Sequence, residues 1–323
     1  MAETSDGTRH GRAVLCALVG AVMFGFLGIF TRYLHVDKGV ASFDVATLRL
    51  LLATVALLLV LVIVERAELR VHPRDLPFFI LFGVFKFLSD GTLFFAMGQI
   101  NISLATLLQM TAPYYVMILS LFLFRERITA QRLIAVMMTF VGCMLVTGVL
   151  IGESRLDLLG VVSALLSGLF YALYLLGGRV GTRRGYHPVT LLFYYFLFGT
   201  VSAMLFTALT SDLPGTLVRL AEPDVLGAAL FLGVGLTLIP YYLYAYATAN
   251  ASTTLVSMVS VVELVVATLV GYVFFDEVLS ALNILGISLV LGSIVVADVH
   301  ISRRVRERRA QDASTDQDGN GPD

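Results

Sequence analysis

Four ionisable residues lie inside long apolar stretches of this chain, where charged groups are rare. They are Arg49, Lys86, Asp90 and Glu263. A charge at the centre of a membrane span costs about 2.5–3.5 kcal/mol on insertion scales, so such side chains usually face one another, water or a ligand. Two of the four are basic and two are acidic, so they can neutralise one another. We therefore expect them to line a polar site inside an otherwise apolar protein.

Lys86 and Asp90 form the most specific part of this pattern. They are four residues apart, which places both side chains on one face of a helix. One interpretation is a pair that binds a solute or a proton, and the alternative is a structural ion pair. Apolar residues would serve a purely structural role at least as well, which favours the binding role. We predict that both residues bind substrate and that Asp90 also takes part in proton coupling.

Glu263 is the second carboxylate predicted to bind substrate and to take part in proton coupling. It follows Ser257 and Ser260 at a spacing of three, so all three share a helical face. A carboxylate in apolar surroundings can bind and release a proton near neutral pH. The alternative is that Glu263 pairs with one of the two basic residues in the spans.

Further candidates come from polar, aromatic and helix-bending residues in the spans. Three more are predicted to bind substrate, namely Gln109, Tyr114 and Tyr241. Tyrosine rings hold planar or cationic groups, although membrane tyrosines also serve as interface anchors and packing residues. A proline removes a backbone hydrogen bond, and a glycine permits close or flexible packing. The residues predicted to act in structure or gating are Arg49, Gly91, Pro113 and Pro240.

The composition indicates which elements must position these residues. Of 323 residues, 58% are hydrophobic and only 14% are charged, whereas soluble domains are about 45–50% apolar and 25% charged. Spans of about 20 apolar residues cross a bilayer as helices, because backbone groups in lipid must bond internally. We predict an all-α integral membrane protein with ten transmembrane helices, at 13–33, 44–64, 76–98, 103–124, 130–150, 156–178, 188–210, 225–247, 252–274 and 279–300.

The chain contains an internal duplication, most visible between 96–127 and the stretch from Ala245. At one constant offset, Ala96 and Asn101 fall on Ala245 and Asn250. Five spans per copy is an odd number, so the second copy must enter the membrane inverted. The predicted organisation is a cytoplasmic segment at 1–12, one five-helix repeat at 13–150, a second at 156–300, and a disordered cytoplasmic tail at 302–323.

The distribution of charge predicts orientation and partners. Of the 22 arginines and lysines, only four fall in the predicted outer segments, namely Arg32, Lys38, Arg155 and Arg219. Because basic residues gather on the cytoplasmic side, both termini are predicted to be cytoplasmic in a multi-pass protein of the inner membrane. The net charge of −1 gives no indication of nucleic-acid binding. We infer no metal site, disulfide or cofactor, since both cysteines lie in apolar spans. The expected partners are lipid, a small metabolite and, as one option, protons; a monomer or weak homodimer is expected.

Several motifs resemble a known family. They are Pro113 at the end of the run from Leu104, Leu123-Phe124-Arg125-Glu126 with Gly142 after it, Phe275-Asp276-Glu277 with Gly286 and Gly292, and Arg49 within the run from Phe43 to Ala53. Over residues 13–298 the chain resembles the EamA-type ten-helix branch of the drug/metabolite transporter superfamily. One departure is Leu264, which stands where the family often has a proline. The resemblance implies a carrier for small organic metabolites, with a cavity between the two halves.

These observations together predict a secondary active transporter that moves a small polar or zwitterionic metabolite by alternating access. Amino-acid-like, nucleobase-like and drug-like solutes all fit. An intramembrane enzyme is the first alternative, but the chain has no H-E-x-x-H motif and its five histidines lie in polar ends or turns. A channel is the second alternative, and the apolar spans offer no obvious polar pore. We therefore predict a protein that is not an enzyme.

Overall fold

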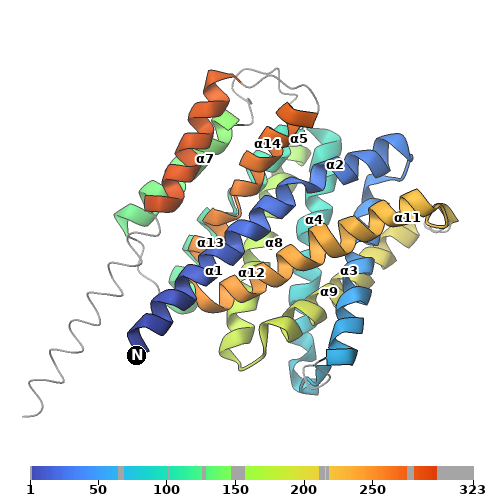
Figure 1. Cartoon of the computed structure of the whole chain (residues 1–323), viewed down its shortest axis with the longest axis horizontal. Helices are drawn as coiled ribbons and strands as arrows, with labels where there is room; N and C mark the ends of the chain where they lie inside the picture. The colour runs from blue at the N-terminus through green and yellow to red at the C-terminus, as the bar shows by residue number, and fades with distance from the viewer. Residues whose placement is uncertain are drawn as a thin grey trace, which may run out of the picture.

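The computed structural model describes residues 2–64, 69–100, 102–125, 129–146, 157–210, 215, 218–274 and 280–296. Within these ranges every regular element is helical (Figure 1). In chain order they are α1 (Ala2–Gly25), α2 (Leu27–Arg32), η1 (Tyr33–Asp37), α3 (Ser42–Val64), η3 (Pro73–Asp75), α4 (Leu76–Gln99), α5 (Ile102–Gln109), α6 (Ala112–Phe124), α7 (Ala130–Val146), α8 (Leu158–Arg183), α9 (Pro188–Thr210), α11 (Pro223–Leu230), η4 (Phe231–Leu238), α12 (Ile239–Asn250), α13 (Thr253–Val259), α14 (Val262–Phe274) and a last helix, Ala281–Val296.

The helices have the lengths and surfaces of membrane spans. Eight helical segments are long and apolar enough to cross a bilayer, and two shorter apolar helices, Leu133–Val146 and Ala281–Val296, fall at the fifth and tenth predicted spans. Large apolar side chains such as Ile63, Phe122 and Leu209 are 74–79% exposed, which suits contact with lipid rather than water. The predicted all-α membrane fold is confirmed.

One predicted segment is part of a longer helix, and several others lie outside the described residues. The helix α1 begins at Ala2, so it runs through the predicted segment 1–12 and into the first span. The turns predicted around Asn101, Glu126 and Glu277, and the tail at 302–323, lie outside the described residues.

The duplication is visible in the backbone where the third span turns into the fourth and the eighth into the ninth. Ile100 ends α4 with φ −129° and ψ 170°, and Ala251 ends α12 with φ −134° and ψ 171°. Their amides donate to the carbonyls of Ala96 at 2.9 Å and Ala247 at 2.8 Å. The two copies therefore make the same extended turn with the same hydrogen bond.

The fourth and ninth spans are each interrupted at corresponding points. In the fourth, α5 ends at Gln109 and α6 begins at Ala112; in the ninth, α13 ends at Val259 and α14 begins at Val262. A hydrogen bond to the residue three positions back closes each break, from Thr111 to Leu108 at 3.1 Å and from Val261 to Met258 at 3.2 Å. Both breaks are thus single tight turns within a membrane span.

The two breaks differ in one respect, the proline of the fourth span; in both, a hydroxyl bonds back to the carbonyl three residues earlier, from Thr111 to Leu108 at 2.6 Å in the fourth. In the fourth span Pro113 follows the turn and cannot continue the hydrogen-bond ladder. The ninth span has Leu264 instead, but Ser257 and Ser260 donate their hydroxyl protons to carbonyls three residues earlier, each at 2.8 Å. Such back-bonding competes with the backbone and bends helices. The ninth span therefore breaks without the proline that the family often has.

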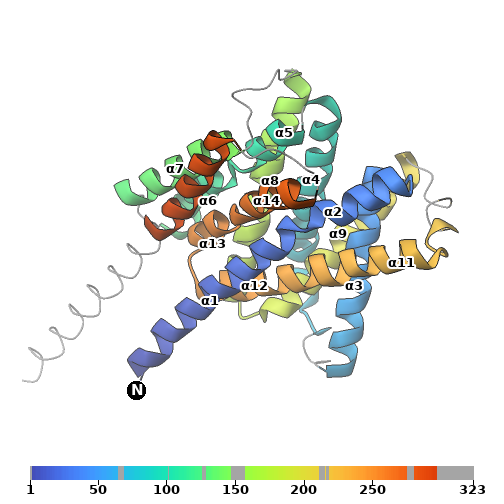
Figure 2. The ribbon, with the colours of Figure 1, turned by 45° about the horizontal axis from the view of Figure 1, so that its top comes forward.

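The central bundle brings helices of the two halves into contact. The helix α4 packs along α8 and α9, α3 packs on α9 and η4, and α1 runs beside α12 (Figures 1 and 2). Two hydroxyl pairs join α3 to α9, Thr47 with Thr207 and Thr54 with Thr200, each at 2.8 Å. Arg49 lies between these two bonds along α3, so its position relative to α9 is held on both sides.

A peripheral pair of helices lies to one side of this bundle. Figures 1 and 2 show α7 beside the last helix, Ala281–Val296. They touch at two glycines, since a Cβ atom built on Gly286 would lie 2.6 Å from the carbonyl oxygen of Gly142. Small residues allow this close backbone contact, as in many membrane helix pairs.

Candidate functional site

A cluster of three charged side chains lies where α3 meets α4. The Asp90 carboxylate accepts a hydrogen bond from the Lys86 ammonium at 2.5 Å and one from the Arg49 guanidinium at 3.2 Å. Lys86 and Asp90 share one helix face, as their spacing predicted, and they form an ion pair with each other. The third member, Arg49, comes from a different helix, so its pairing with Asp90 was not predictable from spacing.

This charge cluster, Arg49–Lys86–Asp90, is largely withdrawn from its surroundings. The exposed fraction of the side chain is 1% for Lys86, 10% for Arg49 and 20% for Asp90. The Nε atom of Arg49 is buried and has no hydrogen-bond partner among the described residues. One carboxylate therefore serves two cations, and one guanidinium donor is still available to an acceptor.

Aromatic rings surround the Lys86 ammonium. Its Nζ atom lies 4.9 Å from the centre of the Tyr241 ring and 6.0 Å from that of Tyr174, distances at which the ring face attracts a cation. Tyr241 also meets Phe24 and Phe196 edge to face. The predicted candidate Tyr241 thus borders the charge cluster.

Glu263 lies close to this cluster without joining it. It is in the first turn of α14, immediately after the break in the ninth span. Its carboxylate is near enough to interact electrostatically with Arg49, Asp90 and Lys86, yet it forms no ion pair within the described part of the chain. The alternative prediction, a direct pair with one of these cations, is not what the structure shows.

Two residues predicted to bind substrate, Gln109 and Tyr114, form hydrogen bonds with residues outside the charge cluster. The amide of Gln109 donates to the hydroxyl of Ser167 on α8 at 2.8 Å. Tyr114 donates to the carbonyl oxygen of Val136 on α7 at 3.2 Å. The break between α5 and α6 separates these residues, so Gln109 contacts α8 while Tyr114 contacts the peripheral α7.

The predicted bending points differ in their local structure. Gly91 lies within the unbroken helix α4. Pro240 is buried at the start of α12, directly after the π-helical segment η4. In that segment Thr237 donates to the carbonyl of Leu232, five residues earlier, at 2.7 Å. The proline ring and this widened turn together make the eighth span irregular, as is often found near functional sites.

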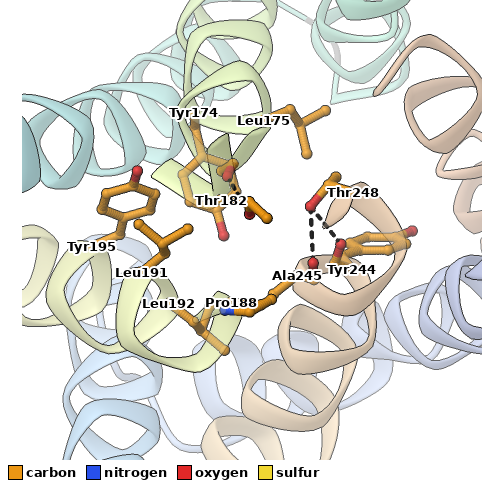
Figure 3. A pocket seen from close by; sticks show the side chains of 11 residues that line it. Tyr174, Leu175, Thr182, Pro188, Leu191, Leu192, Tyr195, Tyr244, Ala245 and Thr248 are labelled. Carbon is orange, nitrogen blue, oxygen red and sulfur yellow. Dashed lines mark hydrogen bonds between the residues drawn. The ribbon is translucent and has the colours of Figure 1, made fainter. Parts of the chain in front are cut away.

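A pocket lies next to the charge cluster, between α8, α9 and α12 (Figure 3). We call it the tyrosine pocket. Its walls include Tyr174 and Thr182 of α8, Leu191 and Tyr195 of α9, and Tyr244 and Thr248 of α12. It offers about 20 Å³ to the centres of water-sized molecules, which is room for one or two waters. None of these six residues was among the predicted site residues, but two of them, Tyr174 and Tyr244, belong to groups of tyrosines within apolar spans, which was the signal in the sequence.

No group of three or more His, Cys, Asp or Glu side chains that could hold a metal ion occurs within the described ranges. The polar groups of the candidate site are those of the charge cluster, Glu263 and the tyrosine hydroxyls.

Comparison with known families places this geometry in context. The model of the EamA-like transporter family matches the chain twice, over residues 11–148 and 158–297. The chain belongs to the EamA-like transporter family. Each match covers one of the two copies, as expected for this two-repeat membrane fold. The charge cluster of this EamA-like transporter joins α3 and α4, within the first copy, and Glu263 lies in the second.

Known relatives of this EamA-like transporter bear transporter names. It is 25% identical over 300 residues to an uncharacterized transporter of Archaeoglobus fulgidus, covering 90% of this chain and 96% of the relative. It is 26% identical over 304 residues to the uncharacterized transporter YwfM of Bacillus subtilis, covering 93% and 97%. A solved crystal structure with 18% identity matches its fold with a TM-score of 0.76, covering 91% of this chain and 98% of that one. The protein is therefore a multi-pass membrane transporter for a small molecule.

Proposed function

We propose that this protein is a secondary transporter that carries a small zwitterionic organic solute across the cytoplasmic membrane by alternating access. The observation that carries the proposal is the arrangement of the four charges inside the spans. One carboxylate, Asp90, is shared by two cations, while a second carboxylate, Glu263, lies nearby without an ion-pair partner in the described structure. Inverted repeats around a site near mid-membrane suit a mechanism that opens to the two sides in turn.

The available groups on these residues match a solute with two charged ends. The buried Nε of Arg49 can donate to a carboxylate, and guanidinium groups bind carboxylates with good geometry. The Glu263 carboxylate can accept hydrogen bonds from an ammonium group. A solute of the amino-acid kind can therefore pair with both Arg49 and Glu263, whereas a neutral nucleobase or a purely cationic drug can pair with at most one of them.

We propose that Glu263 binds and releases the coupling proton. Asp90 has two cationic neighbours at 2.5 and 3.2 Å, so its main task in this proposal is to hold Arg49 and Lys86 in place. A solute ammonium group and a proton would compete for Glu263, and this competition couples their movements. Orientation belongs to the same proposal: both chain ends face the cytoplasm, as the arginine distribution predicts.

Counterflow into proteoliposomes tests this function. Vesicles are loaded with a mixture of unlabelled amino acids, and the accumulation of each radiolabelled amino acid is measured from pH 5.5 to 8.5. We expect saturable accumulation of at least one zwitterion, a loss of about tenfold or more in Arg49→Lys, and loss of pH dependence in Glu263→Gln. Arg49→Lys keeps the charge but lacks the planar fork.

Glu222→Gln provides the matched control, because Glu222 is a surface carboxylate with a 56% exposed side chain. It should transport like the parent protein. Uptake whose pH dependence survives in Glu263→Gln would remove that residue from the coupling role. If only neutral or singly charged compounds exchange, the zwitterion assignment is wrong.

A further inference from the structure

A polar cluster joins the two copies where α11 begins. The carboxylate of Asp224, in the second copy, accepts hydrogen bonds from the Lys38 ammonium and, at 3.3 Å, from the Tyr33 hydroxyl, both in the first copy. Arg219 of the second copy donates to the carbonyl oxygens of Lys38 at 2.7 Å and Gly39 at 2.9 Å. We call these contacts the Asp224 latch, because they tie the segment after the first span to the start of the eighth.

A second cluster makes the same kind of bridge with the copies exchanged. The carboxylate of Asp75, in the first copy, accepts from the Tyr186 hydroxyl at 2.6 Å and from the Arg184 guanidinium at 3.1 Å, both in the second copy. Rings of the first copy hold both donors. The guanidinium carbon of Arg184 lies 4.4 Å from the centre of the Phe78 ring, and Tyr186 meets Phe79 edge to face. We call this cluster the Asp75 latch.

The two latches are equivalent under the duplication. At its constant offset, Asp75 falls on Asp224. A proline precedes each aspartate, and the residue before each proline is extended, with φ −68° and ψ 130° at His72 and φ −72° and ψ 123° at Glu222. Each carboxylate accepts from one tyrosine and one basic residue of the other copy. The chain therefore builds one device twice.

The segments that carry the donors also correspond. Each turns at a glycine in the left-handed region, with φ 64° at Gly39 and φ 89° at Gly185, a conformation that glycine adopts without steric cost. Val40 and Val189 follow these glycines and are related by the same constant offset. They are 2% and 5% exposed, and each belongs to an apolar cluster that contains residues of both copies. Each valine is thus buried beside one latch.

The latches lie on opposite faces of the protein. An inverted copy carries equivalent positions to the other side of the membrane. In Figure 1, α11 begins at the right of the bundle, against η1, whereas α4 begins at its lower edge. In the proposed orientation the Asp75 latch faces the cytoplasm and the Asp224 latch faces the outside.

The latch side chains are exposed enough to open reversibly. Their exposed fractions are 25% for Lys38 and 52% for Asp224 in one latch, and 47% for Arg184 and 29% for Asp75 in the other. Ion pairs this close to the surface are weak. Glu222 lies 3.9 Å from the Lys38 ammonium, too far for a hydrogen bond, and is not part of the latch.

We propose that the Asp75 and Asp224 latches are the two gates of the transport cycle, each closing one face, and that they break in turn. These roles rest on the alternating access proposed above, and they name the residues that close each face. A site between the copies opens to a face only when the copies part there, and it opens to one face at a time. Breaking one latch therefore favours closure of the other, whereas a merely structural contact would loosen only its own surroundings.

Two buried cysteine reporters, one beside each latch, test this reciprocity. They are Val40→Cys and Val189→Cys, each in a chain that also carries Cys16→Ala and Cys143→Ala. The purified protein is treated with N-ethylmaleimide in detergent, and mass spectrometry of the intact protein gives the rate. A buried thiol reacts when its surroundings open, so the rate follows the open population.

Lys38→Glu sets a like charge against Asp224 and should open the Asp224 latch. We expect Val40→Cys to react about tenfold faster or more, because like charges in contact repel strongly. Val189→Cys, on the opposite face, should react at least about threefold slower as the population shifts. The added negative charge alone would slow the nearby thiol, and the distant thiol is beyond the range of exposed charges, so neither change is a direct electrostatic effect.

Arg184→Glu sets a like charge against Asp75 and should reverse both changes, making Val189→Cys faster and Val40→Cys slower. Arg74→Glu is the matched control. Arg74 is an exposed arginine in the same copy as Asp75 and forms no ion pair within the described ranges. Both reporters should therefore stay within about twofold of the parent rate in this variant.

A distant reporter that reacts at the parent rate or faster, in either latch variant, overturns the proposal. Asp224→Lys, which meets Lys38 across the same latch, replaces Lys38→Glu if that variant does not fold. The outcome is separable from that of the counterflow experiment. Opposite responses without zwitterion exchange retain the latches and reject the proposed solute. Zwitterion exchange without opposite responses retains the transporter and rejects the latches.

Discussion

The guanidinium of Arg49 on α3 lies 3.2 Å from the carboxylate of Asp90 on α4. The same oxygen of Asp90 accepts from Lys86, so two basic side chains share one acidic side chain inside the membrane bundle. This relationship makes Asp90 the residue on which the integrity of the charge cluster depends.

Asp90→Ala should destabilise the folded protein by about 3–5 kcal/mol, because removing one partner leaves buried cations uncompensated. Denaturant unfolding in detergent, followed by far-UV circular dichroism, measures this change. The double variant Asp90→Ala/Lys86→Met should recover part of the loss, since it removes one of the stranded charges. Asp75→Ala, which breaks a partly exposed pair with Arg184 and a hydrogen bond from Tyr186, should cost only about 1–2 kcal/mol. Equal losses in Asp90→Ala and Asp75→Ala would contradict the prediction.

Gly286→Ala should loosen the peripheral helix pair. A Cβ atom there would lie 2.6 Å from the Gly142 carbonyl oxygen and 2.7 Å from the Val146 amide nitrogen, and both are backbone atoms that cannot turn aside. We expect a destabilisation of about 1–3 kcal/mol, the range for overpacking. Gly292→Ala is the control, because its Cβ would meet only the tip of Met138 at 3.6 Å. Thermal unfolding of both variants in one detergent compares them, and a neutral Gly286→Ala would show that the contact is not tight.

The double variant Ser257→Ala/Ser260→Ala should restore regular helix at the break in the ninth span. Without the two hydroxyl donors, amides near Val261 can return to the bonding pattern of an α-helix. A regained hydrogen bond of about 1 kcal/mol corresponds to roughly fivefold slower hydrogen exchange. Exchange measured by mass spectrometry over this span checks the result. Ser288→Ala is the control, since Ser288 back-bonds to Ile284 within an unbroken helix. Unchanged exchange in the double variant would mean that something other than the serines holds the break.

Lys38 should make a pH-dependent contribution to stability. Its hydrogen bond to Asp224 raises the pKa of Lys38 above the ordinary value of 10.5. When the pKa is higher in the folded state, the contribution to stability is complete below the pKa of the unfolded state. It is lost as the pH rises through the pKa of the folded state. The difference in melting temperature between the parent and Lys38→Met should therefore be constant from pH 7 to 9 and shrink above about pH 10.5. A difference that grows with pH would reverse the assigned sign.

Local patterns in the sequence predicted the features that depend on one segment alone. The spans follow from runs of apolar residues, and the contact between Lys86 and Asp90 follows from their spacing on one helix. The bend after Gln109 was predicted from Pro113 and is present between α5 and α6. In each case the physical cause acts within a few residues, so it is readable from the chain.

The features that depend on packing between segments were not predictable. Arg49 reaches Asp90 because α3 and α4 meet at that depth. Tyr195 reaches the pocket because three helices converge there, and in the sequence it is one aromatic residue among many in an apolar span. The serine-made break was missed for another reason. Serines in a membrane helix can bond to their own backbone or to a neighbouring helix, and the sequence does not distinguish the two.

The differing origin of the two mid-span breaks makes the duplicated halves mechanically unequal. A proline lacks an amide hydrogen in every conformation, so the kink beside Pro113 is permanent. The kink beside Ser260 is accompanied by hydroxyl hydrogen bonds, and these hydroxyls can donate to another acceptor instead. In the transport cycle that we propose, the half that contains Glu263 therefore has a break that can re-form a regular helix, whereas the break beside Pro113 cannot.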